Sequence, residues 1–348
     1  MPLETYVLDI MEGKRRGRSL LRALSYLYRS GVAIRNEAFD RGILKSYSVG
    51  IPVVSIGNIV AGGTGKTPLV KFLAQQLLQN LNVAILSRGY RSAAEKTGEI
   101  LQVTPETDVF HCGDEPFWLA QQLPRVQVWV GKNRVASAQW ARQKGADVII
   151  LDDGMQHRQI DRDFEIVVVD GEDHFGKGFF LPRGLLRDSP ARLEKADLIV
   201  VSQPVSEKEI ESQLRRFTSA PIVFTHMKAQ MALHGKKFGV FCAIGRPQRF
   251  LKAIRDAGGE ITATFFKPDH DPFYSEELQK FAERSAADAL ICTEKDAVKL
   301  GADLELGLPI IALPASLEIS GNIEAWNHLL TNIQSRAKHD RRIPSHAS

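Results

Sequence analysis

The sequence has few cysteines and no strong excess of charge. Its three cysteines, Cys112, Cys242 and Cys292, lie far apart in a chain of 348 residues, without metal-ligand or disulfide spacing. We therefore expect a reducing, cytoplasmic environment. The formal net charge is only +4, and the basic residues are not interleaved with stacking aromatics. This argues against nucleic acid as a partner.

The sequence also lacks an uninterrupted apolar run long enough to span a bilayer. Met1–Ile10 carries acidic residues and has no apolar core before a small-residue cleavage site, so we expect no signal peptide. These absences leave a soluble protein, or one that lies on a membrane surface.

The first strong pattern runs from Lys14 to Lys45. Apolar residues recur there at helical spacing, with arginines between them: Leu20, Leu21, Leu24, Leu27, Tyr28, Val32 and Ile34, with Arg22, Arg29 and Arg35. The basic residues Lys14, Arg15, Arg16 and Arg18 precede them. Such a helix can lie among lipid headgroups. The same pattern also fits an amphipathic helix packed on its own domain.

From Ile51 onward, short β-branched runs alternate with helical stretches, which is typical of a parallel α/β sheet. A similar alternation resumes after Gln203-Pro204. We predict an N-terminal helical segment at 1–45, a nucleotide-binding domain at 46–205, a second, smaller α/β domain at 206–335 and a flexible basic tail at 336–348.

A glycine-rich segment directly follows the predicted strand Val53–Ile56, and it opens a predicted helix. Its predicted phosphate-binding residues are Val60, Ala61, Gly62, Gly63, Thr64, Gly65, Lys66 and Thr67. Gly65-Lys66-Thr67 matches the end of a Walker A loop, in which Lys66 contacts the β- and γ-phosphates and Thr67 ligates Mg²⁺. Val60 departs from the pattern, which has glycine there.

Acidic residues follow another predicted strand. Val148–Leu151 ends in Asp152 and Asp153, which the parallel sheet would place at the edge where ligands bind. Carboxylates there can hold Mg²⁺, although two adjacent aspartates can also cap the next segment. Together with the glycine-rich loop, they predict a kinase or another P-loop enzyme.

Further motifs match one family in order. They are Val54-Ser55-Ile56-Gly57-Asn58 with Gly62 to Pro68, Ser87-Arg88-Gly89-Tyr90, Gly113-Asp114-Glu115-Pro116, Asp152 to His157, Leu181-Pro182-Arg183-Gly184, Asp269-His270 and Thr293 to Lys299. Over roughly residues 15 to 300, the sequence resembles the tetraacyldisaccharide 4′-kinases of lipid A biosynthesis. Two positions depart from the family pattern: Asp188 follows Arg187 where glutamate is common, and only part of Lys267–Phe273 matches.

The resemblance implies a P-loop domain and a smaller α/β domain joined by a hinge, with ATP and Mg²⁺ as cofactors. It implies transfer of the γ-phosphate to the 4′-hydroxyl of an acylated glucosamine disaccharide 1-phosphate. It also implies a protein peripheral to the cytoplasmic face of the bacterial inner membrane, which favours the membrane interpretation of the N-terminal helix. We expect a monomer.

Site roles follow as hypotheses. Asp114 would act as base, tuned by His270, while Lys66 and Arg187 neutralise the moving phosphoryl group. Mg²⁺ would be held by Thr67, Asp152, Asp153 and Glu115. Substrate contacts would come from Ser87, Arg88, Tyr90 and Arg183, and either Arg183 or Arg187 could hold the acceptor's 1-phosphate. No role emerges for Thr293–Asp296.

Two other P-loop classes are weaker alternatives. A partitioning or regulatory ATPase of the membrane surface has a similar loop, but its signature lysine is replaced by Ala61. A GTPase would need a guanine-reading Asn/Thr-Lys-x-Asp motif, and here Lys295 and Asp296 are adjacent.

Overall fold

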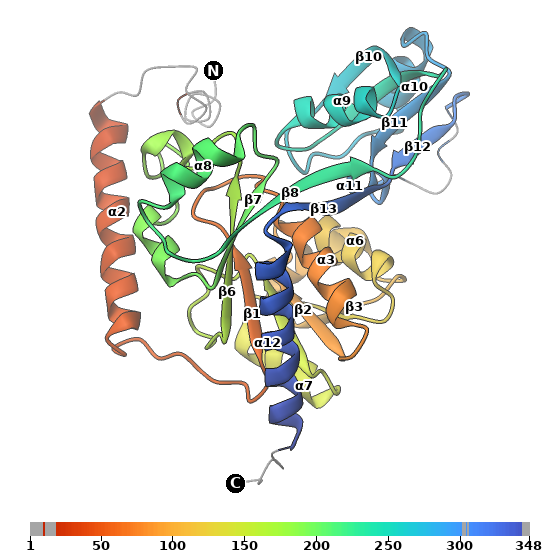
Figure 1. Cartoon of the computed structure of the whole chain (residues 1–348). Helices are drawn as coiled ribbons and strands as arrows, with labels where there is room; N and C mark the ends of the chain where they lie inside the picture. The colour runs from red at the N-terminus through yellow and green to blue at the C-terminus, as the bar shows by residue number, and fades with distance from the viewer. Residues whose placement is uncertain (1–9, 11–18, 301–303, 305, 343–348) are drawn as a thin grey trace.

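The chain builds two separate sheets (Figure 1). The computed structural model describes residues 10, 19–300, 304 and 306–342. The larger sheet contains β1 (Val53–Gly57), β2 (Val83–Ser87), β3 (Leu101–Val103), β4 (Gln127–Val130), β5 (Val148–Asp152), β6 (Phe164–Asp170), β7 (Leu198–Ser202), β8 (Ile222–Ala229) and β13 (Ala315–Gly321). The smaller sheet contains β9 (Lys237–Cys242), β10 (Glu260–Phe266), β11 (Ala289–Thr293) and β12 (Ile310–Leu313).

Helices cover both faces of the larger sheet and flank the smaller one. They are α2 (Ser19–Asp40), α3 (Lys66–Leu77), α4 (Ala93–Thr97), α5 (Val109–Cys112), α6 (Asp114–Gln122), α7 (Arg134–Gln143), α8 (Glu207–Leu214), α9 (Pro247–Asp256), α10 (Ser275–Arg284), α11 (Glu294–Ala297) and α12 (Ile323–Arg342). Short 3₁₀ turns occupy Gly176–Gly178 and Pro190–Lys195. This arrangement confirms the predicted α/β class.

The central strands are buried because helices pack on both sides of them. Their order is β13-β8-β7-β6-β1-β5-β2-β4-β3, and the strands pair in parallel except for the edge strands β3 and β13. Alternate residues of each strand enter different cores: α3, α6 and α12 cover one face, and α7 and α8 pack on the other. Every residue of β1 and β5 is buried, which accounts for their continuous apolar sequences.

Strand register brings the two predicted nucleotide motifs together. Ile56 of β1 lies opposite Asp152 of β5, so the aspartate pair begins beside the start of the glycine-rich loop. Both motifs follow the carboxyl ends of adjacent parallel strands, which is where open α/β sheets bind ligands.

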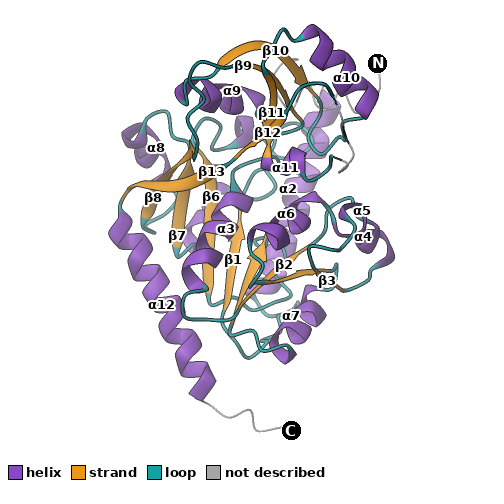
Figure 2. Ribbon diagram, turned by 90° about the vertical axis from the view of Figure 1, so that its right-hand side faces the viewer, coloured by secondary structure: helices purple, strands orange, loops and turns teal. Residues whose placement is uncertain are grey.

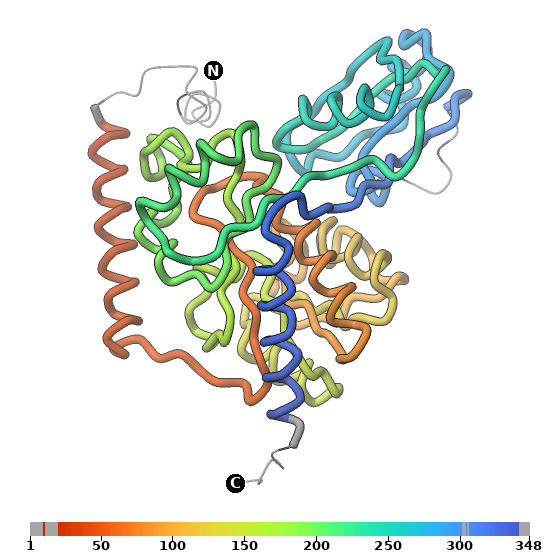
Figure 3. Tube along the Cα trace, viewed as in Figure 1, coloured from red at the N-terminus to blue at the C-terminus, as the bar shows by residue number. Residues whose placement is uncertain are grey.

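The structure corrects the predicted domain boundaries. Strands β8 and β13 pair antiparallel and both belong to the larger sheet, so the chain leaves along one and returns along the other (Figure 3). The smaller unit, β9 to β12 with α9, α10 and α11, is therefore an insertion, and the expected second domain at 206–335 is too long at both ends. The expected boundary overlooked that a late strand can rejoin an early sheet.

The C-terminal segment also returns to the larger unit. Helix α12 runs along the larger sheet (Figure 2), and its Trp326 ring lies 5.3 Å from Phe72 of α3. The indole Nε1 donates to Gln76 at 2.7 Å. Residues 336–342, predicted as part of a tail, continue this helix because Ala337 packs in the core; residues 343–348 lie outside the described ones.

Helix α2 stands at the side of the molecule (Figure 1). Its two most buried side chains, Ser25 and Asn36, are polar. Ser25 donates to the Phe180 carbonyl at 2.8 Å, and the Asn36 amide donates to Asp188 at 3.0 Å. Leu20 and Leu27 remain 69% and 68% exposed. An ordinary packed helix would bury the apolar side instead. The basic residues at 14–18 that form part of this prediction lie outside the described residues.

Candidate active site

The glycine-rich loop joins β1 to α3 through a conformation that depends on glycine. Gly62 and Gly65 have φ values of 105° and 88°, which side-chain-bearing residues rarely adopt. A Cβ on Gly65 would also lie 2.7 Å from the Ser202 hydroxyl oxygen. The loop is braced internally, since the Asn58 amide donates to Thr64 Oγ1 at 2.9 Å. The helix that follows directs its amino end toward the loop, as in anion-binding sites.

The departure at Val60 has a structural explanation. Val60 is buried and forms a bridge with Leu186, while the Ala61 amide donates to the Leu185 carbonyl at 2.7 Å. The first half of the loop thus runs as an extended segment beside residues 185–187, where a β-branched side chain fits. The Ala61 amide is occupied by this contact, which leaves the segment from Gly62 to Thr67 as the candidate phosphate cradle.

Asp153 gathers two cations of the candidate site. Arg187 reaches its carboxylate with two guanidinium nitrogens, at 2.7 and 2.9 Å, and Lys66 Nζ lies 3.4 Å away. Burial opposes ionisation of this carboxyl, but Lys66 and Arg187 outweigh it and hold the pKa of Asp153 far below its usual range. Arg187 also donates to Asn58 Oδ1, which ties it to the phosphate loop. Lys66 and Arg187 therefore converge on one position.

Asp152 experiences the opposite environment. Burial, followed by the charges of Glu115 and Asp153, raises its pKa to about 7. The charges of Glu115 and Asp153 thus oppose ionisation of Asp152 at the end of β5, and a bound cation would relieve that repulsion. Among the residues that the structure describes, no group of three or more His, Cys, Asp or Glu side chains is arranged to hold a metal by itself. Mg²⁺ commonly takes one or two carboxylates with phosphate oxygens, so the donor set fits it.

A second pair forms where the smaller unit meets α6. His270 Nδ1 lies 3.0 Å from Asp114 Oδ2, although 156 positions separate the two residues. Asp114 is the first residue of α6, where the helix dipole favours an anion. Burial opposes its ionisation, but His270, Lys295 and Lys299 prevail and lower its pKa to about 2. The carboxylate is therefore ionised at neutral pH.

The predicted substrate residues are distributed unevenly around this pair. The Tyr90 ring stands edge-on to His270 at 5.8 Å, and the Ser87 hydroxyl donates to Asp152 at 3.3 Å. Arg88, by contrast, pairs with Glu95 at 2.6 Å on the exposed surface. Arg183 stacks on the Phe179 ring at 3.6 Å. The structure thus brings Tyr90 and Ser87 to the site, while Arg88 and Arg183 have partners elsewhere.

Sequence reasoning missed three polar residues of this region. Arg134 is buried and donates to the Asp153 carbonyl at 3.2 Å. It follows strand β4 just as Asp152 ends β5, so the rule about strand ends could have found it. Asn58 lay within a quoted motif but received no role. Lys295, which contacts Glu115 at 2.9 Å, also lay within a quoted motif without a role, because its partner belongs to the larger unit.

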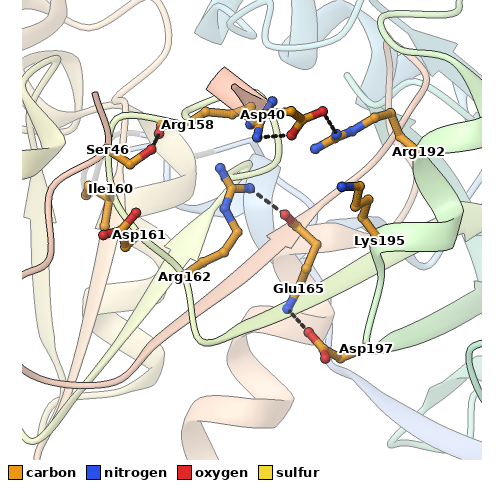
Figure 4. A pocket seen from close by; sticks show the side chains of 10 residues that line it. All are labelled: Asp40, Ser46, Arg158, Ile160, Asp161, Arg162, Glu165, Arg192, Lys195 and Asp197. Carbon is orange, nitrogen blue, oxygen red and sulfur yellow. Dashed lines mark hydrogen bonds and ion pairs between the residues drawn. The ribbon is translucent and has the colours of Figure 1, made fainter. Parts of the chain in front are cut away.

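A separate polar cavity of about 270 Å³ lies at the other edge of the sheet (Figure 4). Arg158 and Arg192 both pair there with Asp40, at 2.6 and 3.2 Å, and Arg162 pairs with Glu165. The cavity lies near the amino ends of β6 and β7, at the opposite edge from the nucleotide site. Its cations pair with acids, and these ion pairs attach α2 to the larger unit. Asp188 has a similar anchoring role through Asn36 of α2.

Comparisons with known proteins agree with this geometry. The model of a family described as tetraacyldisaccharide-1-P 4′-kinase matches residues 17–334. A tetraacyldisaccharide 4′-kinase of Chlamydia abortus is 38% identical, covering 80% of each chain. That of Syntrophus aciditrophicus is 32% identical, covering 91% of this chain and 94% of the relative. The crystal structure of LpxK from Aquifex aeolicus in complex with ATP has a TM-score of 0.73 and 28% identity, covering 90% of this chain and 98% of that one.

Proposed function

This chain belongs to the tetraacyldisaccharide-1-P 4′-kinase family, and from that premise we propose how its residues transfer phosphate from ATP to the 4′-hydroxyl of a tetraacylated disaccharide 1-phosphate, a lipid A precursor. The observation that carries the proposal is the Asp114–His270 contact, which joins the smaller unit to the edge of the sheet where the phosphate loop opens. A partitioning or regulatory ATPase needs no such pair for a hydroxyl acceptor.

The donor half of the site binds ATP. The loop from Gly62 to Thr67 receives the phosphates on its backbone and on the amino end of α3. Lys66 and Arg187, which contact Asp153 here, are positioned to exchange that carboxylate for phosphoryl oxygens. Their charge would then stabilise the γ-phosphoryl group as it separates from ADP.

Mg²⁺ fits beside these cations. Thr67, Asp152, Asp153 and Glu115 are the residues that would hold it, directly or through water, together with phosphate oxygens. When bound, the ion neutralises charge on the β- and γ-phosphates. The raised pKa of Asp152, caused by burial and by Glu115 and Asp153, supports the assignment.

The acceptor half provides the proton acceptor. The acceptor's 4′-oxygen forms a bond to the γ-phosphorus, the bond from that phosphorus to the bridging oxygen of ADP breaks, and Asp114 takes the hydroxyl proton. With a pKa of about 2, depressed by His270 and the nearby lysines against the effect of burial, Asp114 is a weak base. It therefore serves mainly to orient the hydroxyl and accepts the proton late in a loose transition state. His270 holds the carboxylate in place.

Helix α2 is the proposed contact with the membrane. Leu20, Leu27 and Ile34 are 69%, 68% and 71% exposed, and their spacing puts them on one side of the helix, while Ser25 and Asn36 face the protein. Among the described residues, no helix is both long enough and apolar enough to cross a bilayer. We accordingly propose a monomer that lies on the cytoplasmic face of the inner membrane, with the lipid headgroup delivered to the site.

A transfer assay tests the activity. The protein is incubated with γ-³²P-labelled ATP, Mg²⁺ and either a tetraacyldisaccharide 1-phosphate, simple sugars or proteins. We expect label only on the acylated disaccharide, at the 4′ position. ATP-driven dimerisation without labelled lipid would instead favour the regulatory ATPase.

A vesicle assay tests the membrane contact separately. Leu27→Gln and Ile34→Gln remove apolar side chains that are exposed on α2, and each should weaken partition into anionic vesicles roughly tenfold, the effect of about 1.4 kcal/mol of lost burial. Val205→Gln, at an exposed site away from α2, is the matched control. Equal flotation of all variants would rule out α2 as the contact.

A further inference from the structure

The segment from Thr293 to Lys299 reaches the Asp114–His270 pair, although the transfer scheme gives it no role. Strand β11 ends at Thr293, and α11 with the turn after it carries Lys295 and Lys299, four residues apart and on one helical face. The segment is held firmly. The Thr293 hydroxyl donates to the fully buried Asp296 at 2.7 Å, and Asp296 accepts from the Ala243 amide at 3.3 Å.

Lys295 contacts both units of the protein with one ammonium group. On the side of the larger unit, its Nζ lies 2.9 Å from Glu115 Oε1 and 3.7 Å from Asp114 Oδ2. On the side of the smaller unit, it lies 3.5 Å from Asp269 Oδ1 and 3.5 Å from His270 Nε2. Carboxylates from the two units therefore meet around a single positive charge.

Lys299 adds a second charge behind the first. Its side chain is only 7% exposed and lies 3.8 Å from Asp114 and 3.3 Å from Asp296. Its Nζ forms no hydrogen bond with any residue that the structure describes. A buried ammonium without hydrogen bonds is costly, and the ion pair with Asp296 of the same unit offsets part of that cost. Because Lys299 also lies 3.8 Å from Asp114 of the larger unit, it places a second positive charge at the junction between the units.

The negative charges at this junction would repel each other without the lysine. Asp114, Glu115 and Asp269 each lie within 3.7 Å of Lys295 Nζ, so they are close to one another. Their mutual repulsion would favour separation of the units. Separation would carry His270 away from Asp114, because the two residues belong to different units.

We propose that Lys295 is a positioning residue that closes the smaller unit onto α6 and thereby holds His270 against Asp114. Lys299 supports it as the second cation at the same carboxylate. The catalytic consequence rests on the proposed kinase function, whereas the closure is a property of the chain itself. The two are therefore tested by separate measurements.

Closure is measured as a distance between two spin labels. Cysteines replace Lys96 of α4 and Lys280 of α10, which are exposed on different units. The native Cys112, Cys242 and Cys292 are buried, and burial raises the pKa of each thiol, so labels attach to the introduced cysteines. The distance distribution is recorded without nucleotide and again with ATP and Mg²⁺.

Variants of Lys295 and of a control lysine are compared. Without nucleotide, Lys295→Met should move at least half of the label pairs to a longer, broader distribution. Lys295→Arg, which keeps the charge, should stay close to the parent distribution. Lys252→Met, at an exposed lysine of α9, should leave it unchanged. A Lys295→Met distribution equal to the parent's would overturn the proposal, whatever happens to activity.

Kinetics separate positioning from a merely structural role. Lys295→Met should lower kcat by at least about thirtyfold with KM for ATP within about threefold, and Lys295→Arg should recover most of kcat. A lower melting temperature with unchanged kcat per folded molecule would contradict the proposal. Should Lys295→Met not fold, Glu115→Gln removes the same bridge from the α6 side. The label distances of that variant without nucleotide then test whether the bridge closes the units. If the parent protein phosphorylates no acylated disaccharide, the proposed function fails while the distances still test closure.

Discussion

Asp114→Asn isolates the charge at the centre of the acceptor site. The substitution keeps the shape of the side chain but removes the anion that faces His270 at 3.0 Å and two lysine ammoniums at 3.7 and 3.8 Å. Loss of a positioned proton acceptor typically costs a factor of about 10² to 10⁴ in rate, or about 3 to 5 kcal/mol in the barrier. We expect kcat to fall by this amount and KM for ATP to change by less than about threefold.

The assay is steady-state transfer to the acylated disaccharide, with thermal melting as the control for folding. Lys295 and Lys299 keep Glu115 and Asp296 as partners, so the variant should lose only about 1–3 kcal/mol of stability. His270→Gln should cause a similar loss of kcat, and the double variant little more, because the pair acts as a unit. A kcat for Asp114→Asn within about tenfold of the parent's, about 1.4 kcal/mol, would refute the role of Asp114.

Asp114→Asn should also change how the free energy of unfolding depends on pH in acid. Although burial opposes it, His270 and the lysines lower the pKa of Asp114 to about 2, below the value near 3.9 of an unfolded aspartate. The folded state thus holds this carboxylate ionised, a contribution to stability that is present above about pH 4 and is lost as the pH falls toward 2. Urea unfolding of Asp114→Asn should therefore depend less steeply on pH in that range, and an unchanged slope would contradict the ion-pair geometry.

Three further changes test other parts of the structure. Trp326→Ala should lower the free energy of unfolding in urea by about 3–5 kcal/mol, because the indole is 1% exposed. Trp140→Ala, at a 50% exposed site, should lower it by less than about 1 kcal/mol. Equal losses of stability in the two variants would contradict the packing of α12. Burial and nearby arginines lower the pKa of His157 to about 4. As the pH falls, the unfolded chain therefore binds a proton before the folded protein does, and the free energy of unfolding should decrease by about 1–2 kcal/mol between pH 6.5 and 4. His157→Gln should remove this decrease, and a decrease that persists in the variant would show that another residue causes it. Asp153→Asn should raise the Mg²⁺ concentration for half-maximal activity at least about tenfold, and an unchanged Mg²⁺ titration would exclude Asp153 as a ligand.

The nucleotide half of the site could be predicted from the sequence because its signals are local. A buried β-branched strand, a glycine-rich loop and a helix follow one another within Val53–Leu77, and the aspartates follow another buried strand directly. Parallel pairing places the ends of such strands at one edge, so adjacency in space follows from the pattern. Arg134 follows the same rule and could have been predicted from it. Asp114 and His270 received their proposed roles only through the family resemblance.

The rest depended on the tertiary structure. Composition could not show that β13 and α12 return to the first sheet, because a strand's partner depends on the topology of the whole chain. The outward direction of the α2 apolar stripe was open for the same reason: periodicity defines a face but not what covers it. The contact between Lys295 and Glu115 joins residues 180 positions apart. Local patterns indicated the candidate phosphate-binding residues, and only the insertion of the smaller unit decided which charges meet across the site.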